Sequence, residues 1–477
     1  MAHRVIQNIY DTLVTMDSDF NIIPSLASSW EISPDGKTYV FRLRDDVTFH
    51  DGTPFNAEAV KFNIDRIRDP ATKSYYSIVL LGPIDTVTVI DPQTVQFDFK
   101  APFAPFLDYA SQSFLGMVSP AAVQKFGASY ADNPVGTGPF MFKEWVKQSR
   151  ITLVRNPNYT WGSSVYKHSD AAYLDEVIFR FIPESSTRTG ALQSGEVDLI
   201  ESVFPVDVEK LRGGDTFVAS ALSPGSPFVL QLNQSKPPFN DLAVRKAFLH
   251  GVDRKGLITA LYNDVYELAE GPLAPTTFAY DETIEGMYPY DPAKAKQLLE
   301  DAGWVPGGGG VRAKGADKLE AVYLEGDVDR EQRHAIAESI QAQLKEIGFD
   351  ITIQYLASGP FVEARSQNAY NILGTSFVSS DPDIMTNLYH SSRTTGSAGN
   401  ASKLQSAEVD ALLQEGAQAL TREARVSAYS RLQHFVMENA VVAPIYSFPY
   451  IVAGQNKVNG LTFDVRAYPN LYDIFKT

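Results

Sequence analysis

The spacing of hydrophobic residues changes along the chain. Residues 1–15 have apolar positions in helical spacing and predict a short helix. Alternation of apolar and polar residues predicts a strand at 38–44 and a hairpin at 86–99 with its turn at Asp91. Between these strands, Asn56 is placed to cap a helix. The first part of the chain is therefore predicted to be rich in antiparallel strands.

A second pattern begins near residue 228. A strand pattern at 319–324, a helical pattern at 331–347 and a strand pattern at 349–355 follow one another, and two further helices are predicted at 408–419 and 422–438. Because strand, helix and strand in this order form a βαβ unit, we expect a partly parallel sheet covered by helices. Further strands are expected at 151–155, 177–182 and 228–232, and a helix interrupted at Gly251 over 242–262. With 477 residues, the chain is long enough for about three domains or lobes.

The charge balance narrows the choice of partners. The chain has 41 Lys and Arg against 57 Asp and Glu, which gives a formal net charge of −16. An acidic protein repels phosphate backbones and anionic membrane surfaces, so we expect no nucleic-acid partner. The sequence contains no run of 18 apolar residues, so we expect no direct insertion into a membrane.

The residues that carry chemistry form no clear catalytic pattern. Cysteine is absent and the seven histidines lack the spacing of metal ligands, so we expect no metal and no cofactor. Residues 17–21 start like a calcium loop but depart from it at Ile22, which favours a polar turn. Ser164 and Lys167 have the Ser-x-x-Lys spacing of penicillin-recognising enzymes, but the companion motifs are missing. An acyl-transfer enzyme built on these two residues is a remote alternative.

Several longer strings match one protein family in the right order. They are Leu26-Ala-Ser-Ser-Trp-Glu-Ile-Ser-Pro-Asp-Gly-Lys-Thr-Tyr39, Phe41-Arg-Leu-Arg44, Phe49-His-Asp-Gly-Thr-Pro-Phe55, Pro134-Val-Gly-Thr-Gly-Pro-Phe140, Gly195-Glu-Val-Asp-Leu199, Pro238-Phe-Asn-Asp-Leu-Ala-Val-Arg-Lys-Ala247 and Tyr290-Asp-Pro-Ala-Lys-Ala295. These strings resemble the bacterial extracellular solute-binding proteins of family 5, the receptors of peptide-type and nickel-type ABC importers. The resemblance implies an α/β, two-lobed periplasmic-binding-protein fold of type II, of the large cluster with an extra inserted subdomain.

The resemblance also implies how the chain divides into lobes. The expected parts are residues 1–18, 136–228 and 448–477 for lobe I, 19–135 for the subdomain inserted in lobe I, and 229–447 for lobe II. Proteins of this family normally carry a leading strand and a signal or lipoprotein leader. The chain starts just after them, so we expect a periplasmic or surface-exposed protein whose leader is absent from this sequence.

The implied function is capture of a solute and its delivery to a transporter. Closure of two lobes over a ligand is a hinge motion in which the ligand favours the closed state. The expected partners are a small solute, in first place a peptide or peptide-like molecule, and a membrane ABC permease, and the protein is expected to be a monomer and not an enzyme. Within the same receptor role an oligosaccharide, an opine-like conjugate and a nickel chelate stay open. A chaperone-like protein that binds unfolded segments is a further alternative.

One loop bears on the kind of ligand. Peptide receptors of this family have Gly-Trp-x-x-Asp a few residues before a proline, and the Asp pairs with the peptide ammonium. Counted back from Pro382, Thr375 stands for the Trp and Val378 for the Asp. A buried ammonium without a carboxylate is costly. Either Asp381 or Asp383 replaces the missing group, or the ligand is not an ordinary peptide with a free amino terminus.

The candidate ligand-binding residues follow from this loop and from the lobe crossover that the resemblance implies. They are Thr375, Ser376, Phe377, Val378, Ser379, Ser380, Asp381, Tyr389, Arg393, Tyr446 and Phe448. Arg393 is a possible partner for a carboxylate or phosphate, with a solvated loop arginine as the alternative. Asp381, which precedes a proline, could equally serve only as a helix cap.

Overall fold

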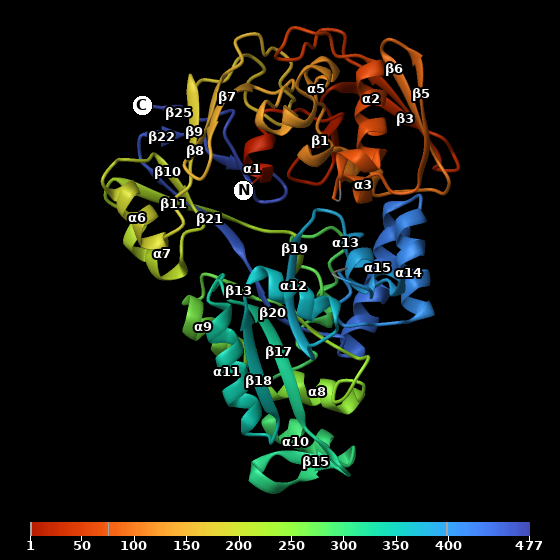
Figure 1. The fold of residues 1–477 in the computed structure, drawn as a ribbon, viewed down its shortest axis with the longest axis vertical. Coiled ribbons are helices and arrows are strands. Elements are labelled where there is room, and N and C mark those ends of the chain that lie inside the picture. The colour runs from red at the N-terminus through yellow and green to blue at the C-terminus, as the bar shows by residue number, and fades with distance from the viewer. Residues whose placement is uncertain (1, 75, 397–398) are drawn as a thin grey trace.

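The computed structural model describes residues 2–74, 76–396 and 399–477. Figure 1 shows two bodies: the first 220 residues and the C-terminal end form the upper one, and most of the rest forms the lower one. We keep the names lobe I for the upper body and lobe II for the lower one. The chain passes between them twice, from β11 (Thr216–Leu222) to β12 (Gly225–Leu232) and from β20 (Val442–Ser447) to β21 (Pro449–Gln455).

Lobe II is built on a six-stranded mixed sheet. Its order is β13 (Glu267–Leu268), β20, β12, β19 (Ile372–Val378), β17 (Glu320–Gly326) and β18 (Asp350–Leu356). Strand β17 is parallel to both β18 and β19, and the helix α11 (Arg333–Lys345) connects β17 to β18. The predicted βαβ unit is thus confirmed. All eight residues of β12 are buried, as expected for a central strand covered on both faces.

The helices that cover this sheet follow one another along the chain in the predicted order. The predicted break at Gly251 is confirmed, because α8 (Leu242–Gly251) ends there and α9 (Arg254–Tyr262) begins three residues later. The hairpin of α14 (Ala407–Gln418) and α15 (Arg422–Glu438) lies directly below the inserted subdomain (Figure 1). The remaining elements of lobe II are η4 (Glu282–Ile284), α10 (Pro292–Asp301), β14 (Val305–Pro306), η5 (Gly308–Gly310), β15 (Arg312–Lys314), β16 (Asp317–Lys318), α12 (Ser358–Ser366), α13 (Ile384–Tyr389) and η6 (Ser391–Arg393).

The subdomain of lobe I is an antiparallel sheet covered by one helix. Its order is β3 (Ala27–Ile32), β4 (Thr38–Leu43), β6 (Thr94–Phe99) and β5 (Ile84–Asp91), and α2 (Ala57–Arg68) packs on β5 and β6. Both the predicted strand at 38–44 and the hairpin at 86–99 are confirmed. Asn56 caps α2 through its side-chain oxygen, which accepts the N–H of Ala59 at 3.0 Å. Phe41, Phe97 and Phe106 form the aromatic centre of this core.

Lobe I is completed by small sheets and short helices. They are β1 (Val14–Met16) with β2 (Ile22–Pro24); β7 (Phe140–Val146), β8 (Arg150–Arg155) and β9 (Glu176–Arg180); β10 (Leu199–Glu201), β21 and β11; β22 (Val458–Asn459) with β25 (Phe475–Lys476); β23 (Thr462–Phe463) with β24 (Pro469–Asn470); and α3 (Ser77–Leu80), α4 (Phe106–Ala110), α5 (Pro120–Phe126), α6 (Ser185–Gln193), α7 (Pro205–Leu211), η1 (Pro70–Thr72), η2 (Ser113–Leu115) and η3 (Gly127–Asp132). The domain boundaries stay predictions; the one after residue 228 falls inside β12, and the one after residue 447 falls at the end of β20.

The predicted helix over residues 1–15 is only partly right. The helix α1 (Ala2–Ile6) is short, and the chain is extended again at β1. The carbonyls of Asn8 and Ile9 accept the N–H groups of Phe140 at 3.0 Å and Gly138 at 2.8 Å. A longer helix would use these carbonyls within itself, so pairing with residues 138–140 ends α1 early.

Candidate functional site

The two crossing points place the end of β19 between the lobes. Val378, the last residue of β19, pairs with Gly225, the first residue of β12. Gly225 has φ +104°, and a Cβ there would lie 2.2 Å from the carbonyl oxygen of Phe377. Only glycine tolerates this approach. The loop that follows Val378 then reaches lobe I through Ser380.

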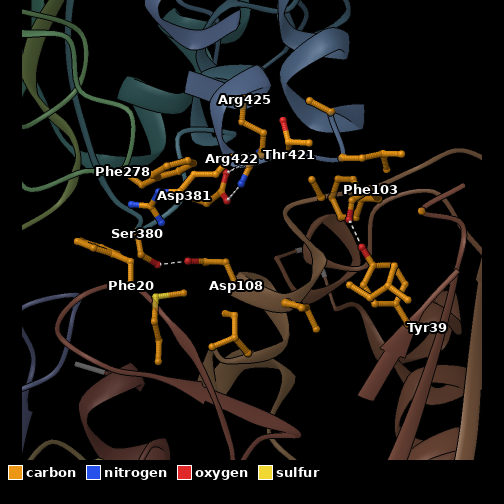
Figure 2. A pocket seen from close by; sticks show the side chains of 18 residues that line it. Phe20, Tyr39, Phe103, Asp108, Phe278, Ser380, Asp381, Thr421, Arg422 and Arg425 are labelled. Carbon is orange, nitrogen blue, oxygen red and sulfur yellow. Dashed lines mark hydrogen bonds and ion pairs between the residues drawn. The ribbon is translucent and has the colours of Figure 1, made fainter. Parts of the chain in front are cut away.

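This loop contacts the inserted subdomain directly. The hydroxyl of Ser380 donates to the carboxylate of Asp108 across the cleft (Figure 2). Two further hydrogen bonds join the lobes: the Tyr109 hydroxyl donates to Asp383 Oδ2 at 2.8 Å, and the N–H of Ala104 donates to the carbonyl of Ala417 at 2.8 Å. The lobes are therefore closed against each other on this side of the molecule.

Asp381 is held inside lobe II by an arginine. Arg425, on the first turns of α15, donates to both oxygens of Asp381 at 2.9 and 2.7 Å. Both side chains are almost inaccessible to solvent, at 11% and 4% exposure. Burial disfavours the charged guanidinium, but the charge of Asp381 and its hydrogen bonds outweigh it and raise the pKa of Arg425. Asp381 thus already has a cationic partner.

The charged forms of two neighbouring carboxylates, Asp383 and Asp108, are less well stabilised. Burial, followed by the charge of Asp381, raises the pKa of Asp383 to about 6. Asp383 accepts hydrogen bonds from Tyr109 and from Thr386, the latter at 2.8 Å. Burial also raises the pKa of Asp108, although the Arg466 guanidinium at 3.2 Å opposes this rise. Three carboxylates therefore meet at the lobe interface with two arginines.

A cavity of about 280 Å³ opens beside these contacts, and we call it the cleft cavity. Figure 2 shows that both lobes line it: Phe20, Tyr39, Phe103 and Asp108 come from lobe I, and Phe278, Ser380, Asp381, Thr421, Arg422 and Arg425 from lobe II. Most of its walls are apolar, with a few polar groups at one end. Concave, largely apolar sites of this kind between two bodies are typical of ligand-binding pockets.

A smaller and more polar cavity of about 80 Å³ lies within lobe I. It is lined by His3, Asp11, Asp464 and Arg466 among others, and Met16 lines both cavities. Burial, and then the charge of Arg466, lowers the pKa of His3 to about 3, so its imidazole is neutral near pH 7. The Nε2 atom of His3 is buried and has no hydrogen-bond partner among the described residues.

The other predicted residues from 375 to 379 make their contacts within lobe II. The Thr375 hydroxyl accepts a hydrogen bond from Gln231 at 2.9 Å, and the Ser376 hydroxyl accepts one from Arg333 at 3.1 Å. Phe377 packs on the core of lobe II, and the Ser379 hydroxyl donates to the carbonyl of Asp381 at 2.9 Å. Of the predicted residues, Ser380 and Asp381 line the cleft cavity.

The predicted residues outside β19 lie away from that cavity. Tyr446 is buried next to the crossing point, where its hydroxyl donates to Glu331 at 2.6 Å. Phe448 stands between β20 and β21 and is half-buried, and Tyr389 at the end of α13 is fully buried. Arg393 ends the short turn η6 and lines neither cavity. Ligand contacts by these residues stay predictions.

The structure also places the motifs that the sequence left as alternatives. Ser164 and Lys167 are exposed in an irregular segment, not one helical turn apart on a helix. The Asp17 carboxylate accepts the N–H groups of Asp19 and Asn21, which confirms the polar turn. Phe20, at the tip of this turn, has φ +63° and lines the cleft cavity. Among the described residues, no group of His, Asp or Glu is placed to hold a metal ion.

Sequence reasoning missed most residues of the cleft cavity. Asp108, Arg422 and Arg425 sit in segments that gave no motif, and Phe278 lies within the irregular segment between β13 and η4. The available signal was weak: the sequence around Pro102 and Pro105 is rich in aromatic residues, and one of them, Phe103, lines the cleft cavity. Without a fold, such residues are indistinguishable from core aromatics.

Two α/β lobes joined by two crossing strands, with a cavity between them, define a type II periplasmic-binding-protein fold. The sequence profile of the family described as "Bacterial extracellular solute-binding proteins, family 5 Middle" matches residues 21–399. The chain therefore belongs to the bacterial extracellular solute-binding proteins of family 5. None of the helices in the described ranges has the length and apolar character that a bilayer crossing requires.

Known relatives agree with this membership. The glutathione-binding protein GsiB of Pectobacterium atrosepticum is 32% identical over 312 residues, which are 64% of this chain and 58% of the relative. The chain thus spans less than two thirds of that protein's length. NikA from Brucella suis was solved in complex with Fe(III)-EDTA and matches with a TM-score of 0.88 at 25% identity. The match covers 100% of this chain and 95% of the NikA chain. A second structure is the ABC transporter-associated periplasmic binding protein DppA from Helicobacter pylori in complex with the peptide STSA. Its TM-score is 0.84 at 28% identity, and the match covers 100% of this chain and 93% of that chain.

Proposed function

We propose that this protein captures a small solute between its lobes and delivers it to a membrane ABC permease. It acts as a monomeric receptor in the periplasm or on the outer face of the cell, without a cofactor. The ligand is a peptide or peptide-like solute; an oligosaccharide, an opine-like conjugate and a nickel chelate are the alternatives within the same role. The names and complexes of the relatives, which include a glutathione-binding protein and receptors in complex with a peptide and with a metal chelate, support this range.

The observation that carries the proposal is the cleft cavity, whose walls come from both lobes. A solute there touches Ser380 and Asp381 on one side and Phe20 and Asp108 on the other, so it binds the closed form better than the open one. A ligand shifts a two-state equilibrium only through such differential contacts. Two crossing strands provide the hinge that this motion requires.

The segment from 375 to 381 is proposed to form the lobe II side of the site. Its C-terminal end, Ser380 and Asp381, lines the cavity. Thr375 and Ser376 hold the strand that leads to this end through their hydrogen bonds within lobe II, and the Ser379 hydroxyl bonds to the Asp381 carbonyl of the same lobe. Tyr446 and Phe448 act near the hinge, where a rotation of the lobes changes their surroundings.

The direct test is native mass spectrometry of the purified protein, followed by denaturation and identification of the released molecule. We expect a small solute at one copy per chain, and small-angle scattering should show a smaller radius of gyration when that solute is added back to stripped protein. The proposal fails if peptides, sugars, opines and metal chelates all leave the radius of gyration and the melting temperature unchanged.

A further inference from the structure

Arg422 differs from the other arginines of the two cavities. Arg425 is paired with Asp381, and Arg466 is paired with Asp108. The guanidinium carbon of Arg422 lies 4.4 Å from the centre of the Phe278 ring, and no carboxylate of the described residues pairs with it. Stacking on an aromatic face holds a guanidinium in place while its N–H donors stay available. Arg422 is therefore an exposed cation at the edge of the cavity, stacked on Phe278 and without a carboxylate partner among the described residues.

Apolar side chains form much of the wall around Arg422, and Ser380, Asp381 and Asp108 lie at the same end of the cavity. Phe20, Ile22, Ile32, Leu107, Phe278 and Leu420 line the cleft cavity. Figure 2 shows Phe278 and Arg422 together at the end of the cavity where Phe20 lies, opposite Tyr39. An apolar cavity of about 150 Å³ is enough to hold benzene. The volume of about 280 Å³ thus accommodates an aromatic ring or a branched aliphatic group together with its linking atoms.

The same loop offers no free carboxylate to an ammonium group. Val378 is apolar, Asp381 is saturated by Arg425, and Asp383 receives the hydroxyls of Tyr109 and Thr386. An ammonium placed at this loop would have to displace an existing partner, which is costly for a buried group. Anion recognition at Arg422 needs no such displacement.

We propose that the solute is an organic acid in which a carboxylate lies next to an apolar group. The carboxylate pairs with Arg422, whose planar fork matches the two oxygens of a carboxylate. The apolar group fills the cleft cavity against Phe20 and Phe278. The inference rests on the proposed function and names the class of solute: a peptide with an apolar C-terminal residue and a blocked or unrecognised amino terminus, or a simple hydrophobic acid.

The experiment compares matched acids and amides by isothermal titration calorimetry. The probes are N-acetyl-alanyl-phenylalanine, its C-terminal amide and 3-phenylpropanoate. The variants are R422Q and, as a control, R431Q, since Arg431 lies on the same helix, is exposed and pairs with Glu415 instead of lining the cleft cavity. We expect at least one acid to bind, and the amide to bind about tenfold more weakly than its acid, because one charge-assisted pair is lost. R422Q should weaken the acid about tenfold and leave the amide unchanged, and R431Q should behave as wild type.

Binding of the acetylated dipeptide and not of 3-phenylpropanoate identifies a peptide source, and the reverse identifies a simple acid. Equal binding of acid and amide, or no effect of R422Q, overturns the inference. A panel in which only neutral sugars, amines or chelates bind overturns it too, but leaves the proposed function standing. If no solute of any class binds or compacts the protein, both the inference and the proposed function fall.

Discussion

The inside of lobe II and the contact between the lobes are held by different interactions. Within lobe II, Asp381 and Arg425 form a two-point ion pair that is almost fully buried. Between the lobes, Ser380 and Tyr109 each donate a single hydrogen bond to a carboxylate of the other lobe. The first contact belongs to the fold of one lobe, and the others exist only when the lobes are closed.

This difference suits a hinged receptor. Single hydrogen bonds exchange with water when the lobes separate, so each contributes only about 1–1.5 kcal/mol to closure. The ion pair, in contrast, stays formed in the open and the closed states and keeps the loop at Ser380 in place. The loop is thus rigid while the contact that it makes is reversible.

The largest expected effect is on the free energy of unfolding, when the ion pair between Asp381 and Arg425 is lost. Arg425→Met leaves the carboxylate of Asp381 buried without a cation, and breaking a buried pair in this way costs about 3–5 kcal/mol of the free energy of unfolding. Urea denaturation at pH 7 measures this loss. The double variant Arg425→Met with Asp381→Asn removes the isolated charge and should recover a large part of it. A single variant within about 0.5 kcal/mol of wild type would show that the pair does not support the loop.

The next effect is a pH dependence that comes from Asp383. Burial and the charge of Asp381 raise its pKa to about 6 from an ordinary 3.8, so the folded state binds this proton more tightly than the unfolded state. The resulting stability is complete below about pH 4 and is lost as the pH rises through about 6. Relative to wild type, Asp383→Asn should therefore become more stable from pH 4 to pH 7, by about 3 kcal/mol at most.

Urea midpoints at pH 4, 5, 6 and 7 measure this change. Asp85→Asn, on the exposed face of β5, is the matched control for the loss of one negative charge. A constant difference between Asp383→Asn and wild type across this range would contradict the assignment. Asp381 also faces Asp383 and is paired with Arg425, and the remaining neighbours Tyr109, Tyr429 and Arg425 do not titrate between pH 4 and 7.

Local rules predicted much of the fold correctly. The cap at Asn56, the hairpin at 86–99 and the βαβ unit around α11 depend on residues close in sequence, so periodicity and turn residues are enough to find them. The helix over 1–15 failed where a distant segment intervened, because residues 138–140 take the carbonyls that would have continued it. Periodicity carries no information about such a competitor.

The site could be predicted only in part for the same reason. The loop that ends at Asp381 was found through its resemblance to a family pattern, and it does reach the cleft cavity. Its partners did not follow, because Ser380 and Asp108 are 272 residues apart and Asp381 and Arg425 are 44 apart. A cavity is a property of packed lobes, so Phe20 and Arg422 acquired a role only once the lobes were placed.

A smaller effect is expected from the contact of Ser380 with Asp108. Ser380→Ala removes one hydrogen bond to a carboxylate, worth about 1.5 kcal/mol, so the ratio of open to closed protein should rise about tenfold. Small-angle scattering of the solute-free protein should show a larger radius of gyration. Ser379→Ala is the matched control, since its hydroxyl bonds within lobe II. It should lower stability without changing the radius, and an equal change in both variants would argue against an inter-lobe role for Ser380.

The smallest effect is expected from Tyr109→Phe, which removes one hydroxyl and keeps the ring packing. The Tyr109 hydroxyl donates to Asp383 at 2.8 Å, and this donation matters most when Asp383 is ionised. Opening should therefore be favoured by about 1 kcal/mol above pH 6 and by less at pH 5, where the carboxyl is mostly protonated. Tyr39→Phe is the control, because its hydroxyl donates to the carbonyl of Phe103 within lobe I. Scattering profiles at the two pH values test this prediction. A change in Tyr109→Phe alone that is larger at the higher pH identifies Asp383 as the acceptor that couples closure to protonation. The same change at both pH values would instead assign the contact to packing of the ring.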